Sequence, residues 1–222
     1  MPTAIRCSLR QIYFALRPSV KIDSTRYAYS HSYIRHEFRP RESVLDIGSG
    51  GDPFPFASIL TDRYLEPSHH RSVEFRSQDR PVVVSDIQAL PFADRHFDYV
   101  VCSHVLEHVE NPIQACRELQ RVGGAGFIET PTFMKDALFS WAKGMHKWHV
   151  TSIANRLVFF EYSQRQLEGI QSNEWYQLVF GRTYHPLQKI FRDNQDIFNV
   201  LFEWKDRFEV TVMTLDGRVS SL

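Results

Sequence analysis

Short apolar segments alternate with polar and glycine-rich breaks along the middle of the chain. Five of these segments have the length and composition of buried β-strands. They are residues 43–48, 58–62, 82–85, 97–103 and 126–130. Residues 110–122 instead carry apolar side chains at helical spacing and end at Gly123 and Gly124, which predicts a helix before the last strand. Strands that alternate with helices or loops are typical of a mainly parallel sheet that is buried on both faces.

The pattern changes after Pro131, where helical and strand-like segments follow one another without a repeated unit. The spacing predicts helices over residues 133–142, 164–180 and 186–194. It also predicts one hairpin from residues 148–151 and 156–162, and a final antiparallel hairpin from residues 201–204 and 208–213. We expect the final hairpin to complete the edge of the sheet.

The chain shows no linker-like stretch, so we expect one α/β domain over residues 41–222, with a cap inserted at about residues 132–195. We expect residues 1–40 to form an N-terminal helical segment, in which residues 27–38 are the stronger helix candidate. The predicted fold is a Rossmann-like, mainly parallel sheet with a C-terminal antiparallel hairpin and an inserted cap.

An acid and a glycine-rich turn end the first predicted strand. The residues are Asp46, Gly48, Ser49 and Gly50. Glycine permits positive φ and lets a ligand approach the backbone, and open α/β sheets bind ligands at the carboxyl ends of their strands. The dinucleotide pattern G-x-G-x-x-G would need glycine where Pro53 stands, and a carboxylate is unfavourable beside a pyrophosphate. A cationic ligand without phosphate fits this turn better, and a tight turn without any ligand is the alternative interpretation.

A second block of motif residues lies downstream, in residues 85–92 (SDIQALPF) and 96–109 (HFDYVVCSHVLEHV). Together with the glycine turn, it resembles the type 11 group of class I S-adenosylmethionine-dependent methyltransferases. That group has an acid, a Leu-Pro-Phe turn, a Phe-Asp-apolar strand and an apolar-acid-His-apolar segment in the same order and spacing. The resemblance covers about residues 42–131, and it implies S-adenosylmethionine as the cofactor and methyl transfer as the activity.

The resemblance also implies a role for the residues near the methyl group. The residues that would form the turn under the methionine part of the cofactor are Asp46, Gly48, Ser49 and Gly50. Ser103 and His104, which end the fourth predicted strand, would line the floor near the methyl group. The glycine turn and the end of the fourth strand would therefore meet at the transfer site.

On the adenosine side, the resemblance implies that Asp86 accepts a hydrogen bond from the adenine amino group, with the amide of Ile87 beside it. An acid that ends the second strand would bind the ribose, because a carboxylate can accept two hydrogen bonds from a diol. Asp62 is the first candidate for this acid, and Glu66 is the alternative.

The sequence departs from the family pattern just after the glycine turn. Asp52 replaces the usual third glycine, and Pro53 to Phe56 occupy the place of the first long helix. Two prolines this close cannot lie inside a helix, and the nine residues between Gly48 and Ser58 are too few for a helical crossover. We therefore predict a loop or a single turn here. The departure also supports an alternative function, a degenerate module that binds the cofactor or a protein partner without catalysis.

Two histidines in the predicted cap, His146 and His149, lie on either side of Trp148. They follow the fifth strand, whose carboxyl end borders the transfer site in this architecture, so they could orient the acceptor or remove a proton from it. With His104 they form our set of catalytic candidates, and packing within the cap is the alternative for the two cap histidines. No local spacing supplies the three or four ligands of a zinc site, so we expect no metal.

Composition narrows the range of partners. Lys and Arg together number 26 and Asp and Glu number 26, so no global positive charge would attract nucleic acid. The aromatic content is 14%, and much of it lies after residue 130, where core packing or an aromatic-lined pocket explains it. The predicted cap is aromatic and not conspicuously basic, which favours a small-molecule acceptor over nucleic acid. A Rossmann oxidoreductase is the remaining alternative enzyme, and Asp46 and Pro53 argue against it.

The three cysteines, Cys7, Cys102 and Cys116, show no CxxC spacing, and an odd number suits a reducing compartment, so we expect a cytoplasmic protein. No window approaches 18 consecutive apolar residues, so we expect no integral membrane segment. The sequence determines neither the acceptor nor the oligomeric state.

Overall fold

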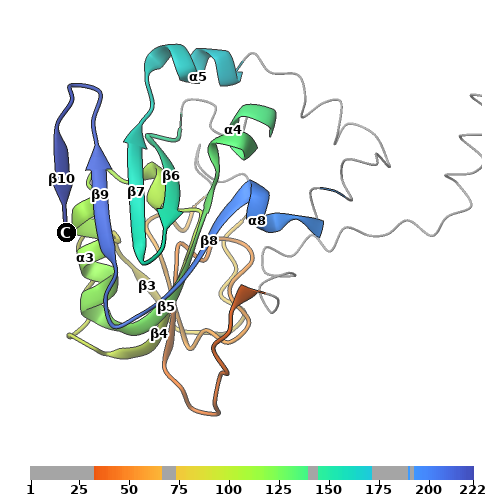
Figure 1. The fold of residues 1–222 in the computed structure, drawn as a ribbon. Helices are drawn as coiled ribbons and strands as arrows, with labels where there is room; N and C mark the ends of the chain where they lie inside the picture. The colour runs from red at the N-terminus through yellow and green to blue at the C-terminus, as the bar shows by residue number, and fades with distance from the viewer. Residues whose placement is uncertain (1–32, 67–73, 140–144, 172–189, 191–192) are drawn as a thin grey trace, which may run out of the picture.

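The computed structural model describes residues 33–66, 74–139, 145–171, 190 and 193–222. The larger of its two sheets has six strands in the order β3-β2-β1-β4-β5-β8. Of these strands, β3, β4, β5 and β8 are labelled in Figure 1. Their bounds are β1 Val44–Ile47, β2 Ile59–Asp62, β3 Val82–Val84, β4 Phe97–Ser103, β5 Gly123–Pro131 and β8 Asn199–Lys205. The first five strands are parallel and β8 is antiparallel to β5, which confirms the predicted mainly parallel, Rossmann-like sheet.

The strand order places a topological switch point between β1 and β4. From β1 the chain runs to β2 and β3 on one side of the sheet, whereas β4 and β5 lie on the other side. Loops that leave β1 and β4 in opposite directions open a crevice at the carboxyl edge of the sheet, where α/β proteins bind ligands. The residues that follow these two strands are therefore the expected ligand-binding residues.

The second sheet has four strands in the order β10-β9-β7-β6. Their bounds are β6 Trp148–Ile153, β7 Arg156–Glu161, β9 Glu209–Met213 and β10 Val219–Ser221. β6 and β7 form the predicted antiparallel hairpin, and β7 pairs in parallel with β9. Two strands of the predicted cap therefore share a sheet with two strands that follow the cap in sequence.

The predicted pairing of residues 201–204 with residues 208–213 is wrong, although β9 and β10 form a C-terminal antiparallel hairpin and β8 completes the edge of the larger sheet. β8 pairs with β5 at the edge of the larger sheet, whereas β9 pairs with β7 and β10 in the other sheet. The link between them redirects the chain, because Asp206 has φ +61° and its amide donates to the carbonyl of Gly124 at 2.9 Å. Phe208 is then buried against Phe202 and Trp204. The apolar alternation that suggested a hairpin therefore fills the core between two sheets.

The helices with described bounds follow β4. They are η1 Leu106–His108, α3 Pro112–Val122, α4 Phe133–Phe139, α5 Gln164–Gln171 and α8 Gln195–Phe198. α3 confirms the predicted helix; it begins at a proline, and the side chain of Asn111 accepts a hydrogen bond from the amide of Gln114 at 3.1 Å. Most of the predicted helix over 186–194, and the part of 164–180 beyond α5, lie outside the described residues. Among the described residues, every helix is too short or too polar to cross a membrane.

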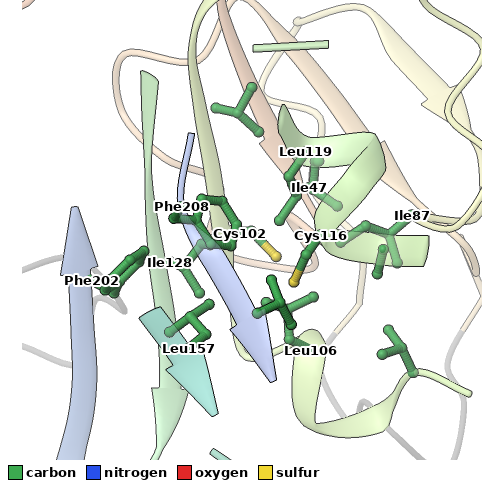
Figure 2. Close-up of a cluster of buried hydrophobic side chains, with 14 of the residues drawn as sticks. Ile47, Ile87, Cys102, Leu106, Cys116, Leu119, Ile128, Leu157, Phe202 and Phe208 are labelled. Atoms are coloured by element: carbon green, nitrogen blue, oxygen red, sulfur yellow. The ribbon is translucent and has the colours of Figure 1, made fainter. Parts of the chain in front are cut away.

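One face of the larger sheet is covered by α3 and the second sheet. Figure 2 shows Cys116 and Leu119 of α3 in one cluster with Ile47 of β1 and Cys102 of β4. Leu157 of β7 belongs to the same cluster and is fully buried. The helix and the two sheets therefore share a single apolar core.

The opposite face is covered without a first-crossover helix. Residues 49–58 contain turns and no helix, as the prolines predicted. Phe54 is only 2% exposed and lies in an apolar cluster with Leu60 and Tyr99. An aromatic side chain from the proline-rich segment thus covers part of this face.

The helix predicted over residues 27–38 is wrong for its described end, because residues 34–38 are not helical. The amides of Arg35 and His36 donate to the carboxylate of Glu203 at 3.0–3.2 Å. This long-range partner satisfies the backbone, so the segment does not need helical hydrogen bonds. The remainder of the predicted helix lies outside the described residues.

Candidate functional site

The glycine turn lies at the carboxyl end of β1, against the loop that follows β4. Gly48 and Gly50 have φ of +67° and +57°, a region that strains residues with a Cβ. The amides of Gly48 and Ser49 donate to the carbonyl of Thr61 at 2.8 and 3.1 Å. A Cβ on Gly48 would lie 2.3 Å from Cγ2 of Val105. Position 48 therefore requires glycine for both its backbone conformation and its lack of space.

Asp46 lies in β1 at the base of this turn and is fully buried. Its Oδ2 accepts a hydrogen bond from the amide of Phe54 at 2.7 Å. The acid predicted to lie near the methionine part of a cofactor is therefore next to the turn. It also holds the proline-rich segment that replaces the first helix.

Asp62 ends β2 and contacts the glycine turn directly. Its Oδ2 accepts a hydrogen bond from the amide of Gly50 at 3.1 Å, and its Oδ1 accepts one from the amide of Tyr64 at 2.9 Å. Glu66 lies four residues further along the chain and is exposed. This geometry favours Asp62 over Glu66 as the acid beside the turn.

Asp86 follows β3 at the same edge of the sheet. Its Oδ1 accepts a hydrogen bond from the amide of Gln88 at 2.9 Å, and its Oδ2 lies 3.3 Å from Nη1 of Arg63. The Asp86 side chain is 31% exposed, so a ligand can reach its carboxylate. The next residue, Ile87, is buried in the core and fixes this loop to the sheet.

Ser103 and His104 follow at the centre of the edge, where β4 ends. Ser103 is fully buried, and His104 has φ +56°, which is uncommon for a residue with a side chain. The His104 amide donates to the carbonyl of Glu129 at 2.8 Å, and its Nε2 lies 3.1 Å from the Oε1 of that residue. Its Nδ1 lies 3.4 Å from Oε1 of Glu107. His104 thus joins the glycine-turn region to a group of buried ionisable side chains.

We refer to this group as the histidine–carboxylate cluster. Its members are His104, Glu107, His108, Glu129, Lys135, Asp136, His146 and Tyr162. Each of its carboxylate residues is 1% exposed or less. Carboxylates this far from water require charged or hydrogen-bonding partners.

Glu107 is the acid that the cluster's histidines surround. Its Oε1 lies 3.4 Å from Nδ1 of His104 and 3.8 Å from Nε2 of His108. Burial alone would raise the pKa of Glu107, but the neighbouring rings of His104, His108 and His146 outweigh it and lower the pKa to about 2. Glu107 is therefore ionised at neutral pH, although it is almost completely buried.

Asp136 orients His146 within the cluster. Its Oδ2 accepts hydrogen bonds from Nδ1 of His146 at 3.0 Å and from the hydroxyl of Tyr162 at 2.8 Å. Burial alone would lower the pKa of His146, but the bond to Asp136 and the charge of Glu107 raise it above its usual value. A carboxylate that holds Nδ1 fixes the ring and directs Nε2 toward a second partner.

Lys135 brings a cation into the cluster from α4. It is 2% exposed, and its Nζ donates to Oδ1 of Asn199 at 2.5 Å and lies 3.4 Å from Nε2 of His104. Asn199 in turn donates to Oε1 of Gln195 at 2.8 Å. The first residue of β8 therefore helps to position a charge beside His104.

His149, the third catalytic candidate, lies on β6 among aromatic rings. Its ring stacks on Phe160 with centroids 4.9 Å apart, and the rings of Phe133 and Tyr162 lie at 5.7 and 6.0 Å. Burial lowers the pKa of His149, which favours its neutral form. The structure thus brings His104 and His146 together around Glu107 and places His149 in aromatic surroundings.

Sequence analysis missed Glu107, Lys135 and Asp136. Glu107 stands in the Leu-Glu-His segment that carried the family resemblance, so its position was visible but its burial was not. Lys135 and Asp136 lie in a helix without a motif, and only the fold brings them to the histidines. Polar residues in a predicted helix next to a strand end were the one signal for them.

Residues 45–126 match the model of a methyltransferase domain family. The matched segment contains the glycine turn, Asp86 and the end of β4. It confirms the predicted resemblance to class I S-adenosylmethionine-dependent methyltransferases over this part of the chain. S-adenosylmethionine is accordingly the cofactor that the matched domain implies.

An uncharacterised protein of Methanocaldococcus jannaschii is 36% identical over 111 residues. The aligned segment covers 47% of this chain and 48% of that protein, so the chain spans about half the length of this relative.

Three solved structures are similar at low identity. In the Haloferax volcanii complex between the methyltransferase activator Trm112 and a methyltransferase, the match is 14% identical, covers 57% of this chain and 69% of the other, and has a TM-score of 0.40. A Thermotoga maritima methyltransferase, described as a possible histamine N-methyltransferase, is 18% identical over 60% and 63% of the two chains, with a TM-score of 0.39. A Methanosarcina mazei methyltransferase is 15% identical over 66% and 82%, with a TM-score of 0.35. At these scores the likenesses add nothing to the strand order described above.

Proposed function

We propose that this protein transfers the methyl group of S-adenosylmethionine to a small-molecule acceptor. The observation that supports the proposal most strongly is the arrangement of the glycine turn, Asp62 and Asp86. They follow the adjacent strands β1, β2 and β3 at one edge of the sheet, beside the switch point. That order matches the methionine, ribose and adenine parts of an extended cofactor.

The donor and acceptor groups at this edge fit the cofactor. The Asp62 carboxylate accepts two amide hydrogen bonds at the turn, and a carboxylate is the acceptor-only group that a ribose diol, with two hydroxyl donors, requires. The Asp86 carboxylate is accessible to an adenine amino group. Asp46 adds a third carboxylate near a cofactor that carries a sulfonium and an ammonium group.

The bound cofactor supplies an electrophilic methyl group, and alignment of the acceptor provides much of the remaining rate enhancement. We assign this alignment to Ser103 and His104 at the end of β4 and to the proposed cap of residues 132–195. His146, whose ring Asp136 holds, is our candidate for removing a proton from the acceptor. His149 would contact an apolar part of the acceptor together with its neighbouring rings.

A second candidate is a module that binds the cofactor without turnover. It is favoured by one observation, the first crossover, which contains turns where the related family has a helix. The dipole at the N-terminus of that helix would therefore be missing from the cofactor site.

Calorimetry with S-adenosylmethionine and S-adenosylhomocysteine tests binding, and formation of S-adenosylhomocysteine across a small-molecule library tests turnover. We expect binding of both compounds and turnover with at least one class of acceptor. Binding without turnover across hydroxyl, amine and thiol acceptors would favour the second candidate. No heat and no thermal shift with either compound would reject both.

A further inference from the structure

Three side chains of the histidine–carboxylate cluster have the composition and spacing of a metal site. Glu107 and His108 come from η1, and His146 precedes β6. Each offers one ligand atom, and these atoms all lie within 4.8 Å of one another. Sequence analysis predicted no metal, because only Glu107 and His108 are close in sequence and the third ligand comes from the distant cap.

In both His108 and His146, the hydrogen bonds leave the lone pair on Nε2. Nδ1 of His108 lies 3.0 Å from the carbonyl of Met145, which can only accept, so this nitrogen carries the hydrogen. Nδ1 of His146 is held by the Asp136 carboxylate in the same way. Nε2 is then the coordinating atom in both rings. Metal-ligating histidines almost always show this pattern, with the second ring nitrogen donating to a carboxylate or a backbone carbonyl.

Glu107 provides an independent observation. It is 1% exposed, and neither of its carboxylate oxygens accepts a hydrogen bond from the residues that the structure describes. Buried carboxylates in native proteins nearly always accept such hydrogen bonds. The Oε1 of Glu107 lies 3.4 Å from Nδ1 of His104 and 3.8 Å from Nε2 of His108, and a cation between Oε1 and the His108 ring would explain the longer of these separations.

We propose that Glu107, His108 and His146 bind a divalent transition-metal ion, with Zn²⁺ as the best match. Two imidazoles and one carboxylate are a common ligand set for zinc, and three protein ligands leave a fourth position for water or substrate. Zinc bonds of about 2.0–2.2 Å in a tetrahedral site place ligand atoms roughly 3.4 Å apart. The 3.8 Å between Glu107 and His108 is a few tenths of an ångström longer than this, and all three ligand atoms, which lie within 4.8 Å of one another, would move closer together around the ion.

The ion would lie next to the proposed transfer site. Val105, which contacts the glycine turn, immediately precedes η1, and Glu107 of η1 lies 3.4 Å from His104. The inference therefore deepens the proposed function by adding a cation beside the acceptor, and in the metal-bound form Nε2 of His146 is a ligand and no longer accepts a proton. Binding of the ion does not depend on the methyltransferase proposal and is measured without cofactor.

The test is a titration of the full chain with Zn²⁺ and with Co²⁺ after dialysis against a chelator. We expect one equivalent of metal by elemental analysis, visible absorption of tetrahedral Co²⁺, and a higher unfolding temperature with Zn²⁺ than with chelator. His108→Gln and His146→Gln should each lose the Co²⁺ absorption. His96→Gln and Glu110→Gln, which change residues outside the cluster, should retain it.

Asp136→Asn provides a graded test, because removing the carboxylate that holds a metal-ligating histidine weakens affinity about 10–100-fold. The wild-type titration needs no variant to fold, so it decides the proposal even if substitutions in the cluster unfold the protein. A wild-type chain that binds neither ion, or cluster variants that bind as tightly as the two controls, would overturn it. Calorimetry with S-adenosylmethionine on metal-free protein separates this outcome from failure of the proposed function.

Discussion

The two sides of the carboxyl edge are built in different ways. On the glycine-turn side, backbone conformation determines the structure. Gly48 and Gly50 have positive φ, and amides of the turn donate hydrogen bonds to the Thr61 carbonyl and the Asp62 carboxylate. On the side of the histidine–carboxylate cluster, the histidine side, contacts between buried side chains from different segments determine the structure, as in the hydrogen bond between Asp136 and the ring of His146. The first side depends on what the backbone allows and the second on charge compensation, so substitutions should affect them differently.

The largest expected effect is that of Gly48→Ala. Positive φ costs a residue with a Cβ about 1–2 kcal/mol, and the overlap with Val105 adds roughly 1–3 kcal/mol of overpacking. The free energy of unfolding in urea should fall by the sum of these two terms. Gly217→Ala is the matched control, because Gly217 also has positive φ, +82°, but no atom within 4 Å of its Cβ position. Equal losses in the two variants would show that Val105 moves aside without cost.

Asp136→Asn should have the next largest effect, on the histidine side. It weakens the hydrogen bonds from His146 and Tyr162 in a fully buried place, so we expect a loss of about 2–3 kcal/mol. Tyr162→Phe removes one of these bonds and should cost about 1 kcal/mol. Chemical denaturation of both variants and the double variant forms a thermodynamic cycle. If the losses simply add, Asp136 and Tyr162 are not energetically coupled, and the cluster is not the connected unit described here.

Asp62→Asn should weaken S-adenosylmethionine binding and also lower stability by about 1 kcal/mol, because one of the two oxygens that accept amide hydrogen bonds becomes an NH2 group. Replacing one carboxylate oxygen by an amide removes an acceptor for the ribose, which typically costs about 1–2 kcal/mol of binding free energy. Glu66→Gln is the control, because Glu66 lies four residues away and is exposed. Calorimetry that ranked Glu66→Gln as the more damaging change would transfer the ribose role to Glu66.

The smallest expected effect concerns a side-chain anchor on the glycine-turn side. Glu118 accepts hydrogen bonds from Arg121 and from the amide of Leu90 at 2.8 Å each, and Arg121 donates to the Leu90 carbonyl at 2.9 Å. The pair therefore holds the turn that follows Asp86. The hydrogen bond from Arg121, with that from Leu90, lowers the pKa of Glu118.

Because this pKa is lower in the folded state, the pair stabilises the fold above the unfolded glutamate pKa of about 4.3. That stability is lost as the pH falls through the lower folded value. Glu118→Gln should cost about 1 kcal/mol at pH 7 and reduce the loss of stability below about pH 4, as measured by urea denaturation across pH. The exposed Glu110→Gln should leave the wild-type pH dependence unchanged. The anchor makes no contribution if Glu118→Gln also behaves like wild type.

Local patterns explain why the glycine-turn side was predictable from sequence. The strand over 97–103 was predicted with its observed bounds, and Asp46, Asp62 and Asp86 were placed at the correct edge because each lies within two residues of the carboxyl end of a short strand. The prolines in 53–56 correctly excluded a helix. In each case residues close in sequence determine the structure.

Long-range pairing explains what the sequence could not predict. Alternation over 201–213 is the same for a hairpin and for two strands in different sheets, and only the partners β5 and β7 distinguish the two cases. Residues 34–38 have helical spacing, but the Glu203 carboxylate binds their amides. Convergence of Glu107 and Asp136 on His146 depends equally on the fold, so no spacing rule could have identified the cluster.

The parallel pairing of β7 with β9 has a consequence for synthesis on the ribosome. Arg156 and Glu209 are neighbours in that pairing although 53 residues separate them in sequence. The strands β1 to β4 can pair soon after they leave the exit tunnel, whereas the second sheet must wait until β9 has emerged. Until then, β7 has its hairpin partner β6 but lacks β9 on its other side, and this open edge can associate with other chains. A nascent chain of this protein should therefore be most prone to aggregation between translation of β7 and of β9, and a slow codon in that interval would prolong the exposure.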